Sequence, residues 1–240
     1  MHNAAFRTLG MDWTYELLDV SPDQLRDAVS QLRAEDVGGA NVTIPYKQAV
    51  MDQLDTLAPD ALRARAVNTI VKDGGRLGGY NTDIPAIRGA IEELGVEPAS
   101  INAVILGAGG AARAAAVAME GAHITFVARH PDDADVPGEV VRWDDPSVAT
   151  LTRSSDLLVN ATPLGRREEM PLRPAALPRE GAVLDLVYVT GGTPLVRKAR
   201  ALGLKAVDGW EVLLAQGAIS FLLWTGRSAP LAAMRETLQP

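Results

Sequence analysis

The chain contains no cysteine, which excludes disulfides, thiolate nucleophiles and metal sites built on Cys ligands. This absence fits a reducing compartment, and we expect a cytoplasmic protein. The first residues, MHNAAFRTLG, lack the basic flank and the apolar run of a secretory signal. The longest apolar stretch, residues 212–224, is interrupted by Gln216 and too short to span a bilayer. The sequence therefore predicts a soluble chain without a membrane partner.

The chain is also poor in basic residues relative to acidic ones. It has 23 lysines and arginines against 30 acidic residues, for a formal net charge of −7. No local basic patch stands out against this background, so we expect no nucleic-acid partner. The three histidines, His2, His123 and His130, have no metal-ligand spacing, so no metal site is predicted.

Short apolar strands alternate with helical segments over most of the 240 residues, which predicts an α/β fold with a parallel sheet covered on both faces. Near the N-terminus we expect a strand at 14–20, a strand at 40–44 and a helix opened by Pro45 that carries Lys47. Turn residues between 68–72 and 76–81 predict a hairpin, followed by a helix at about 85–94. Further strands are expected at 101–106, 123–128, 140–143, 157–160, 182–187 and 204–207.

A glycine-rich turn lies between a predicted strand and an Ala-rich helix. Gly107, Gly109 and Ala112 form a G-x-G-x-x-A pattern in the run INAVILGAGGAARAAAVAM. The first glycine permits the tight turn, the second allows backbone to approach a pyrophosphate, and the alanine permits close helix packing. Because a strand precedes the pattern, a helix follows it and a second strand comes at the right distance, the sequence predicts a dinucleotide site.

The second strand of this unit ends at Arg129, where an NAD site usually places an acid for the ribose hydroxyls. An arginine there offers a cation to a 2′-phosphate and favours NADP. A solvated surface arginine is the alternative, and Asp132 and Asp133 would repel a phosphate.

Lysine is scarce: of the 23 basic residues only Lys47, Lys72, Lys198 and Lys205 are lysines. A lysine at a strand-to-helix turn therefore suggests a role that arginine cannot fill, such as gain and loss of a proton. Several polar and charged residues are expected at strand ends that face one crevice, namely Asn41, Thr43, Lys47, Asn68, Asn81 and Asp83. A solvated lysine, a turn residue at Asn68 and a helix cap at Asp83 are the alternatives.

Six blocks in order resemble the shikimate dehydrogenase family. They are NVTIPYK at 41–47, AVNT at 66–69, GYNTD at 79–83, GAGGAAR at 107–113, NATPLG at 160–165, and the stretch from Gly209 through LLAQGAISFLLWTG. The resemblance covers almost the whole chain. It implies a two-domain α/β protein, with an N-terminal α/β substrate domain and a Rossmann-type dinucleotide-binding domain.

The resemblance also implies an activity, which is the NADP-dependent reduction of 3-dehydroshikimate to shikimate in aromatic amino acid biosynthesis. Lys47 and Asp83 match the family's catalytic pair, with Lys47 transferring the proton at the reacting oxygen. Thr43, Asn68 and Gln216 would hold ring hydroxyls, and Tyr188 would reach towards the substrate carboxylate. Without the family, a core aromatic at Tyr188 and a helix-face amide at Gln216 are the alternatives.

The matching blocks also imply the cofactor site and the domains. Cofactor contacts are expected from Gly107, Ala108, Gly109, Gly110, Ala111, Arg129, Ala161, Thr162 and Gly209. Residues 1–83 and 211–240 would form the substrate domain and residues 84–210 the NADP-binding domain. The expected assembly is a monomer or a homodimer. A quinate/shikimate dehydrogenase that uses NAD, and a nucleotide-binding protein without turnover, are the competing hypotheses.

The chain departs from the family at its start. The family normally has a first strand and a Ser-x-Ser motif, whose serines grip the substrate carboxylate, before the segment that matches MHN at residues 1–3. If Met1 is the true start, each lost charged hydrogen bond is worth about 1.5–3 kcal/mol, and we expect weak turnover or none.

Overall fold

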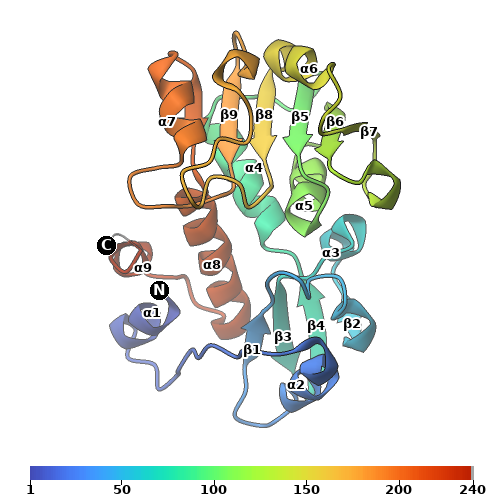
Figure 1. Ribbon diagram of the computed structural model, residues 1–240. Helices are drawn as coiled ribbons and strands as arrows, with labels where there is room; N and C mark the ends of the chain where they lie inside the picture. The colour runs from blue at the N-terminus through green and yellow to red at the C-terminus, as the bar shows by residue number, and fades with distance from the viewer. Residues whose placement is uncertain (239–240) are drawn as a thin grey trace. The chain divides into compact units, whose positions relative to one another are not determined.

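The computed structural model describes residues 1–238, which divide into two compact units (Figure 1). Unit 1 contains Met1–Thr82 together with the segment from Leu214 onwards, and unit 2 contains Asp83–Leu213. The boundary near the C-terminus falls inside one long helix, α8 (Gly209–Thr225), so this helix contributes residues to both units.

Unit 1 is built on a four-stranded mixed sheet in the order β1-β3-β4-β2. The strands are β1 (Gly39–Asn41), β2 (Thr56–Leu57), β3 (Thr69–Asp73) and β4 (Arg76–Tyr80). The predicted hairpin is confirmed, because β3 and β4 pair antiparallel around Gly74 and Gly75, both with positive φ. The expected all-parallel arrangement is wrong for this unit, because β1 also pairs antiparallel with β3.

Helices and apolar side chains complete unit 1. Its helical segments are α1 (His2–Thr8), η1 (Pro22–Gln24), α2 (Leu25–Gln31), η2 (Met51–Gln53), α3 (Pro59–Ala64), α9 (Leu231–Glu236) and most of α8. Ser21 and Gln24 form a capping box ahead of α2. One apolar cluster packs around Val67 and Ile70, and a second packs Phe6 against Phe221.

Two predicted elements of unit 1 are wrong. Residues 14–20 lie in an irregular segment, because the backbone N–H and C=O of Tyr15 bond the side chain of Asn3 instead of a neighbouring strand. Residues 45–50 form turns instead of a regular helix, because the Lys47 carbonyl accepts the N–H of Val67, at 2.7 Å, from a distant segment.

Unit 2 has a six-stranded, wholly parallel sheet in the order β10-β9-β8-β5-β6-β7. The strands are β5 (Asn102–Leu106), β6 (His123–Ala128), β7 (Glu139–Arg142), β8 (Leu157–Asn160), β9 (Ala182–Asp185) and β10 (Lys205–Val207). Each of the six predicted strands of this region is confirmed within two residues at either end. The order is that of a dinucleotide-binding fold. After β5, the strands β6 and β7 are added on one side, and the chain then crosses to the other side of β5, where β8, β9 and β10 follow. The reversal point of this strand order lies between β5 and β8.

Helices cover both faces of this sheet. The helical segments are α4 (Asp83–Glu93), α5 (Gly110–Ala118), η3 (Pro131–Asp133), α6 (Val148–Ser154), η4 (Pro174–Ala176) and α7 (Pro194–Ala201). Val148 of α6 and Leu195 of α7 pack on Val104, Leu158 and Val183. Ile105 lies between Val104 and Leu106 in β5, so its side chain points to the opposite face of the sheet, and it is also buried. The helices α4 and α5 pack against each other.

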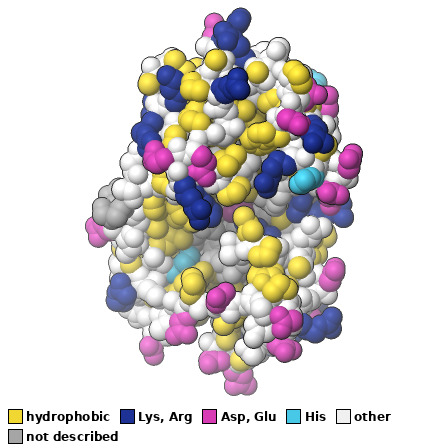
Figure 2. All heavy atoms as spheres, in the orientation of Figure 1, with side chains coloured by type: hydrophobic (Ala, Val, Ile, Leu, Met, Phe, Trp, Pro, Cys, Tyr) yellow, Lys and Arg dark blue, Asp and Glu magenta, His cyan; other side chains and the backbone are white. Residues whose placement is uncertain are grey.

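The surface carries both signs of charge. On the face shown in Figure 2, the lysine and arginine side chains do not gather into one continuous patch, and acidic side chains lie between them. Within residues 1–238, no helix combines the length and the apolar character needed to cross a membrane.

Candidate active site

Strand register brings three chain segments of unit 1 to one edge of its sheet. Asn41 is paired with Thr69, and Thr69 is paired in turn with Tyr80. Because the strands alternate in direction, the end of β1, the start of β3 and the end of β4 meet in one row. The predicted site residues Asn68 and Thr43 and the GYNTD block therefore belong to the same edge.

Buried hydroxyl and amide groups form a network at this edge. Asn68, Thr69, Thr82 and Ser220 are all buried. Asn68 Oδ1 accepts the backbone N–H of Thr82 at 2.7 Å, and the hydroxyl oxygens of Thr69 and Ser220 lie 2.8 Å apart. Ser220 Oγ is also 3.1 Å from Thr82 Oγ1. These four side chains are amides and hydroxyls, and they satisfy one another's buried polar atoms.

Gln216 joins this network from α8, one helical turn before Ser220. Its Oε1 is 3.5 Å from both Asn68 Nδ2 and Thr82 Oγ1, a distance at which hydrogen bonds are weak. Ser220 Oγ donates to the Gln216 carbonyl at 2.9 Å, which ties the two positions of the helix together. The structure thus brings together two of the predicted substrate residues, Asn68 and Gln216.

Lys47 reaches the same edge through its backbone. Its carbonyl accepts the Val67 N–H, and the next N–H, of Asn68, donates to the Tyr80 carbonyl at 3.0 Å. The turn of Lys47 therefore lies beside the segment that leads into Asn68. Thr43 lies in the preceding turn, where its carbonyl accepts the N–H of Tyr46 at 2.9 Å, and its side chain is exposed.

Asp83 directly follows the buried Thr82 and is the first residue of α4, which assigns it to unit 2. Its side chain is partly buried. The neighbouring Thr82 N–H is fixed by Asn68, so the backbone just before Asp83 is anchored in the polar network. The pairing of Lys47 with Asp83 stays a prediction.

The residue-level prediction missed three polar members of this edge: Thr69, Thr82 and Ser220. Asn41, which was expected at the crevice, joins them: its Nδ2 donates to the Asn68 carbonyl at 3.2 Å and to Ser220 Oγ at 3.1 Å, and its Oδ1 accepts the Tyr15 hydroxyl at 3.0 Å. The three missed residues stand inside the motif blocks, which is a usable signal. Ser220 is separated from Thr69 by 151 residues, so local spacing could not place it beside Thr69.

In unit 2, the two loops that flank the reversal point of the sheet lie next to each other. Gly107 follows β5 and has φ +106°, and a Cβ built on it would come within 3.2 Å of the Ala161 carbonyl oxygen, which follows β8. Only glycine fits this approach without strain. The predicted residues Gly107 and Ala108 are therefore brought beside Ala161 and Thr162.

The start of α5 is suited to an anionic group. Gly109 occupies the N-cap position without a side-chain cap, and a Cβ built on it would meet nothing within 4 Å. Gly110 and Ala111 are the first two residues of the helix, whose backbone N–H groups have no partner within the helix itself. Open space beside uncapped amides at a helix N-terminus fits a pyrophosphate.

Of the remaining predicted residues of unit 2, Arg129 and Tyr188 lie in loops and Gly209 is the first residue of α8. Arg129 directly follows β6 and is exposed. Tyr188 is 41% exposed, and its ring packs against Trp210 at a centroid distance of 5.0 Å. Gly209 is buried, and a Cβ built on it would lie 2.5 Å from the Leu186 carbonyl oxygen. Gly209 is therefore required by packing, whatever it contacts in a ligand.

Asp185 is a fully buried carboxylate at the end of β9, and the sequence reasoning did not select it. Burial raises its pKa to about 6, against hydrogen bonds from Thr193, the Val187 N–H and Asn160 that favour the ionised form, while nearby Asp208 raises the pKa further. In the sequence it stands in the run LDLVY at 184–188, three residues before Tyr188.

Comparison with known proteins shows the family. A model of the shikimate dehydrogenase substrate binding domain matches residues 1–70, and a model of the shikimate 5′-dehydrogenase C-terminal domain matches residues 209–239. The shikimate dehydrogenase (NADP(+)) of Moorella thermoacetica is 41% identical over 100% of this chain and 87% of its own length. The chain belongs to the shikimate dehydrogenase family.

Solved structures agree with this membership and show how far the family fold extends. Shikimate 5-dehydrogenase from Thermus thermophilus, in complex with NADP(H) and shikimate, matches with a TM-score of 0.86 at 36% identity, over 98% of this chain and 90% of that one. The ligand-free 5-ketofructose reductase of a Gluconobacter strain matches with a TM-score of 0.83 at 34% identity, over the same shares. The predicted two-domain fold class is confirmed.

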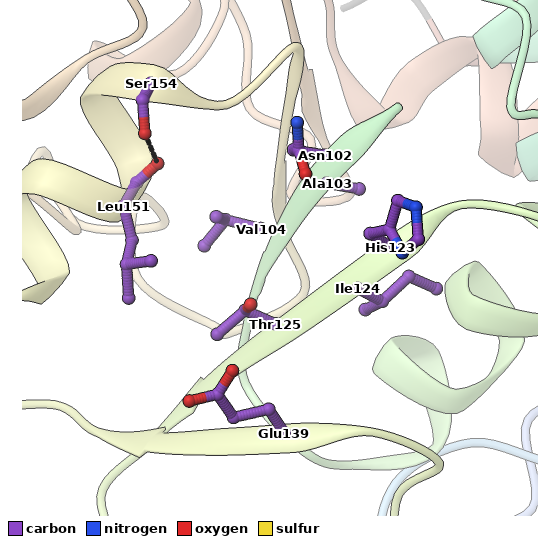
Figure 3. A pocket seen from close by; sticks show the side chains of 9 residues that line it. All are labelled: Asn102, Ala103, Val104, His123, Ile124, Thr125, Glu139, Leu151 and Ser154. Carbon is purple, nitrogen blue, oxygen red and sulfur yellow. Dashed lines mark hydrogen bonds between the residues drawn. The ribbon is translucent and has the colours of Figure 1, made fainter. Parts of the chain in front are cut away.

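One recess of this shikimate dehydrogenase family member lies away from the predicted residues. It has a volume of about 490 Å³ and is lined by residues of β5, β6, β7 and α6. Figure 3 shows His123 and Glu139 at its border, and Asn102 and His123 begin their strands. It therefore lies at the amino ends of the strands, whereas ligands of such sheets bind at the carboxyl ends.

Proposed function

We propose that this protein is an NADP-dependent shikimate dehydrogenase that interconverts 3-dehydroshikimate and shikimate. The observation that carries the proposal is the hydrogen bond from the Val67 N–H to the Lys47 carbonyl, because it places the turn of Lys47 beside the segment that leads into Asn68 and its network of neutral amides and hydroxyls. Neutral donors and acceptors suit the hydroxyl groups of a shikimate ring, and an amine suits the transfer of one proton.

The residues of unit 2 fit the cofactor. Gly107 to Ala111 lead into α5, and Gly107 lies beside Ala161 and Thr162. The pyrophosphate would be held at the start of α5, where a Cβ on Gly109 would meet nothing within 4 Å. Arg129 stands after the second strand of the fold, where it would bind the 2′-phosphate. When bound, NADP supplies or accepts the hydride, and the protein aligns the reacting groups and handles the proton.

The proton is assigned to Lys47. In the direction of reduction, Lys47 gives a proton to the oxygen that becomes the hydroxyl, and in the direction of oxidation it takes that proton back. Asp83 holds the ammonium group in position. Thr43, Asn68 and Gln216 bind ring hydroxyls, and Tyr188 is directed to the substrate carboxylate.

This assignment divides the chain by task. Residues 1–83 and 211–240 would form the substrate-binding domain, and residues 84–210 the NADP-binding domain. The small-molecule partners would be shikimate and 3-dehydroshikimate. A biosynthetic enzyme of this kind is expected in the cytoplasm, which agrees with a chain that has no cysteine.

A steady-state assay of the purified full chain tests the proposal. Shikimate with NADP+ should give reduced cofactor at a rate far above that with NAD+, quinate replacing shikimate should be slower, and 5-ketofructose should not oxidise NADPH appreciably. NADP binding without turnover of shikimate would make the protein a nucleotide-binding member of the family. Faster turnover of 5-ketofructose would assign it the other substrate.

A further inference from the structure

Asp185 is a buried carboxylate to which the reaction assigns no task. It ends β9, and its register partner across the parallel ladder is Asn160, which ends β8. Both side chains are fully buried, and Asn160 Nδ2 donates to Asp185 Oδ1 at 2.9 Å. A buried ion without a charged partner is costly, so its hydrogen bonds must be important to the local structure.

Asn160 transmits this contact to the first of two loops. Its Oδ1 accepts the Thr162 hydroxyl at 2.7 Å and the Thr162 N–H at 3.1 Å, and its Nδ2 also donates to the Leu164 carbonyl at 2.9 Å. The amide of Asn160 therefore shapes residues 161–164, and Asp185 fixes which way that amide points. This loop carries the cofactor candidates Ala161 and Thr162.

The same carboxylate fixes both ends of the second loop, which carries Tyr188. Asp185 Oδ1 accepts the Val187 N–H at 3.0 Å, and Oδ2 accepts the Thr193 hydroxyl at 2.6 Å. Thr193 is also the N-cap of α7, where its Oγ1 accepts the Val196 N–H at 3.2 Å. Trp210 Nε1 adds a bond to the Val189 carbonyl at 3.1 Å on the far side of Tyr188.

We infer that Asp185 is a positioning residue that holds the loop of Ala161 and Thr162 and the loop of Tyr188 in one conformation, so that NADP affinity and the placement of Tyr188 depend on one carboxylate. The inference rests on the proposed function for the tasks of the two loops. Their common dependence on Asp185 rests on the hydrogen bonds alone.

The test compares Asp185→Ala with Asp185→Asn in the full chain. Alanine leaves the Asn160 amide, the Val187 N–H and the Thr193 hydroxyl without their acceptor. Asparagine keeps an oxygen that accepts from Asn160 and Val187, and its NH2 group can donate to the Thr193 oxygen once that hydroxyl turns. We expect Asp185→Ala to speed amide exchange in both 161–165 and 186–192, and to weaken NADP binding by about tenfold. The KM for shikimate should rise with it, whereas Asp185→Asn should stay within about threefold of wild type.

Thr193→Val is the matched control, because it removes the donor to Oδ2 and leaves the Asn160 and Val187 bonds in place. It should change exchange near residue 193 but neither exchange in 161–165 nor NADP affinity. Equal effects of Thr193→Val and Asp185→Ala would show general loosening and would overturn the inference. Release of only one loop by Asp185→Ala, or unchanged NADP affinity, would overturn it too.

Asn160→Ala decides the matter if Asp185→Ala does not fold. This variant cuts only the link to the first loop, so exchange should rise in 161–165 and NADP affinity should fall, while 186–192 exchanges as in wild type. A rise in both loops or in neither contradicts the inference. Amide exchange and NADP binding can be measured without turnover. A wild-type protein that fails to oxidise shikimate would refute the proposed function, and the exchange and binding measurements would still decide the role of Asp185.

Discussion

Units 1 and 2 both gather buried polar groups at one edge of a sheet, but the groups differ in charge. In unit 1 the network of Asn68, Thr82 and Ser220 is made of neutral amides and hydroxyls. In unit 2 the bonds converge on the carboxylate of Asp185. A neutral network keeps its hydrogen bonds over a wide pH range, whereas a buried carboxylate with a pKa near 6 changes its bonding within the physiological range.

The comparison also explains what each network is suited to hold. Neutral donors and acceptors recognise hydroxyl groups without a large desolvation cost, which fits a polyhydroxylated ring at unit 1. An anion placed behind two loops of unit 2 accepts several donors at once, because a carboxylate offers about four lone-pair sites. The first network would contact substrate, and the second would shape loops that contact the cofactor.

The largest expected effect on activity is that of replacing Lys47. Lys47→Met should lower kcat by about a thousandfold, because it removes the group that transfers the proton, and NADP affinity should be unchanged. Steady-state rates and calorimetric titration measure the two quantities. Lys47→Arg is the control, since it keeps the charge but cannot release a proton, and it should be nearly as slow. High activity in that variant would assign Lys47 an electrostatic role only.

The second prediction uses pH to separate the units. Burial lowers the pKa of His2 in unit 1 from 6.5 to about 4, and the charge of the nearby N-terminal amine lowers it further. The contribution of His2 to stability is therefore present above pH 6.5 and lost as pH falls towards 4. Asp185 has the opposite sign: its pKa rises from 3.8 to about 6, so its contribution is present below pH 3.8 and lost as pH rises through 6.

Each shift corresponds to about 3 kcal/mol, so the two contributions should nearly cancel in wild type between pH 4 and 6.5. Melting temperatures of two variants would reveal them. As pH falls from 6.5 to 4, the melting temperature of His2→Phe should rise and that of Asp185→Asn should fall, each relative to its own value at pH 6.5. Parallel pH profiles for the two variants and wild type would contradict both assignments.

The third prediction concerns the open space in unit 2. Gly109→Ala places a methyl group where the structure has nothing within 4 Å, so stability should hold while NADP binding weakens by about tenfold or more. Gly89→Ala is the matched control, because Gly89 lies in α4 with nothing within 4 Å of a built Cβ. It should raise stability by about 0.5–1 kcal/mol and leave NADP affinity alone. Unchanged NADP affinity in Gly109→Ala would remove the pyrophosphate from this position.

The smallest effect is expected in the neutral network. Ser220→Ala removes a hydroxyl that lies 2.8 Å from Thr69 Oγ1 and 3.1 Å from Thr82 Oγ1, and should lower the free energy of unfolding by about 1 kcal/mol. The loss should be the same at pH 5 and pH 7, because no member of the network titrates there. Urea denaturation at both pH values measures it, and a loss that depends on pH would mean that a charged group takes part.

Much of unit 2 could be predicted from the sequence because its signals are local. The apolar runs of β6 and β8 stand between turn residues, and the G-x-G-x-x-A pattern marks the turn after β5. Unit 1 was harder, because its elements depend on distant partners. Tyr15 lies in a segment, 14–20, that reads as a strand, yet its backbone N–H and C=O bond the side chain of Asn3. The helix expected at Lys47 is replaced by turns because the Lys47 carbonyl accepts the N–H of the distant Val67.

The site shows the same division. Asn68 and Gln216 could be selected from the motif blocks, and the structure places them in one network. Ser220 stands in the same block as Gln216, but nothing in the local spacing distinguishes it from another helical serine. Asp185 likewise could not be distinguished from an acid that ends a strand. Their importance comes from contacts that exist only after folding, with Thr69 in one case and Asn160 in the other.

Unit 1 is assembled from two separated parts of the chain, with unit 2 between them, and this has a consequence for biosynthesis. Residues 83–213 leave the ribosome as one continuous stretch and can fold while translation proceeds. The partners of Thr69 and Phe6, which are Ser220 and Phe221, emerge only after all of unit 2 has been made. The nascent N-terminal segment must therefore wait with apolar surface uncovered, and it is the part of the polypeptide for which chaperones would matter most.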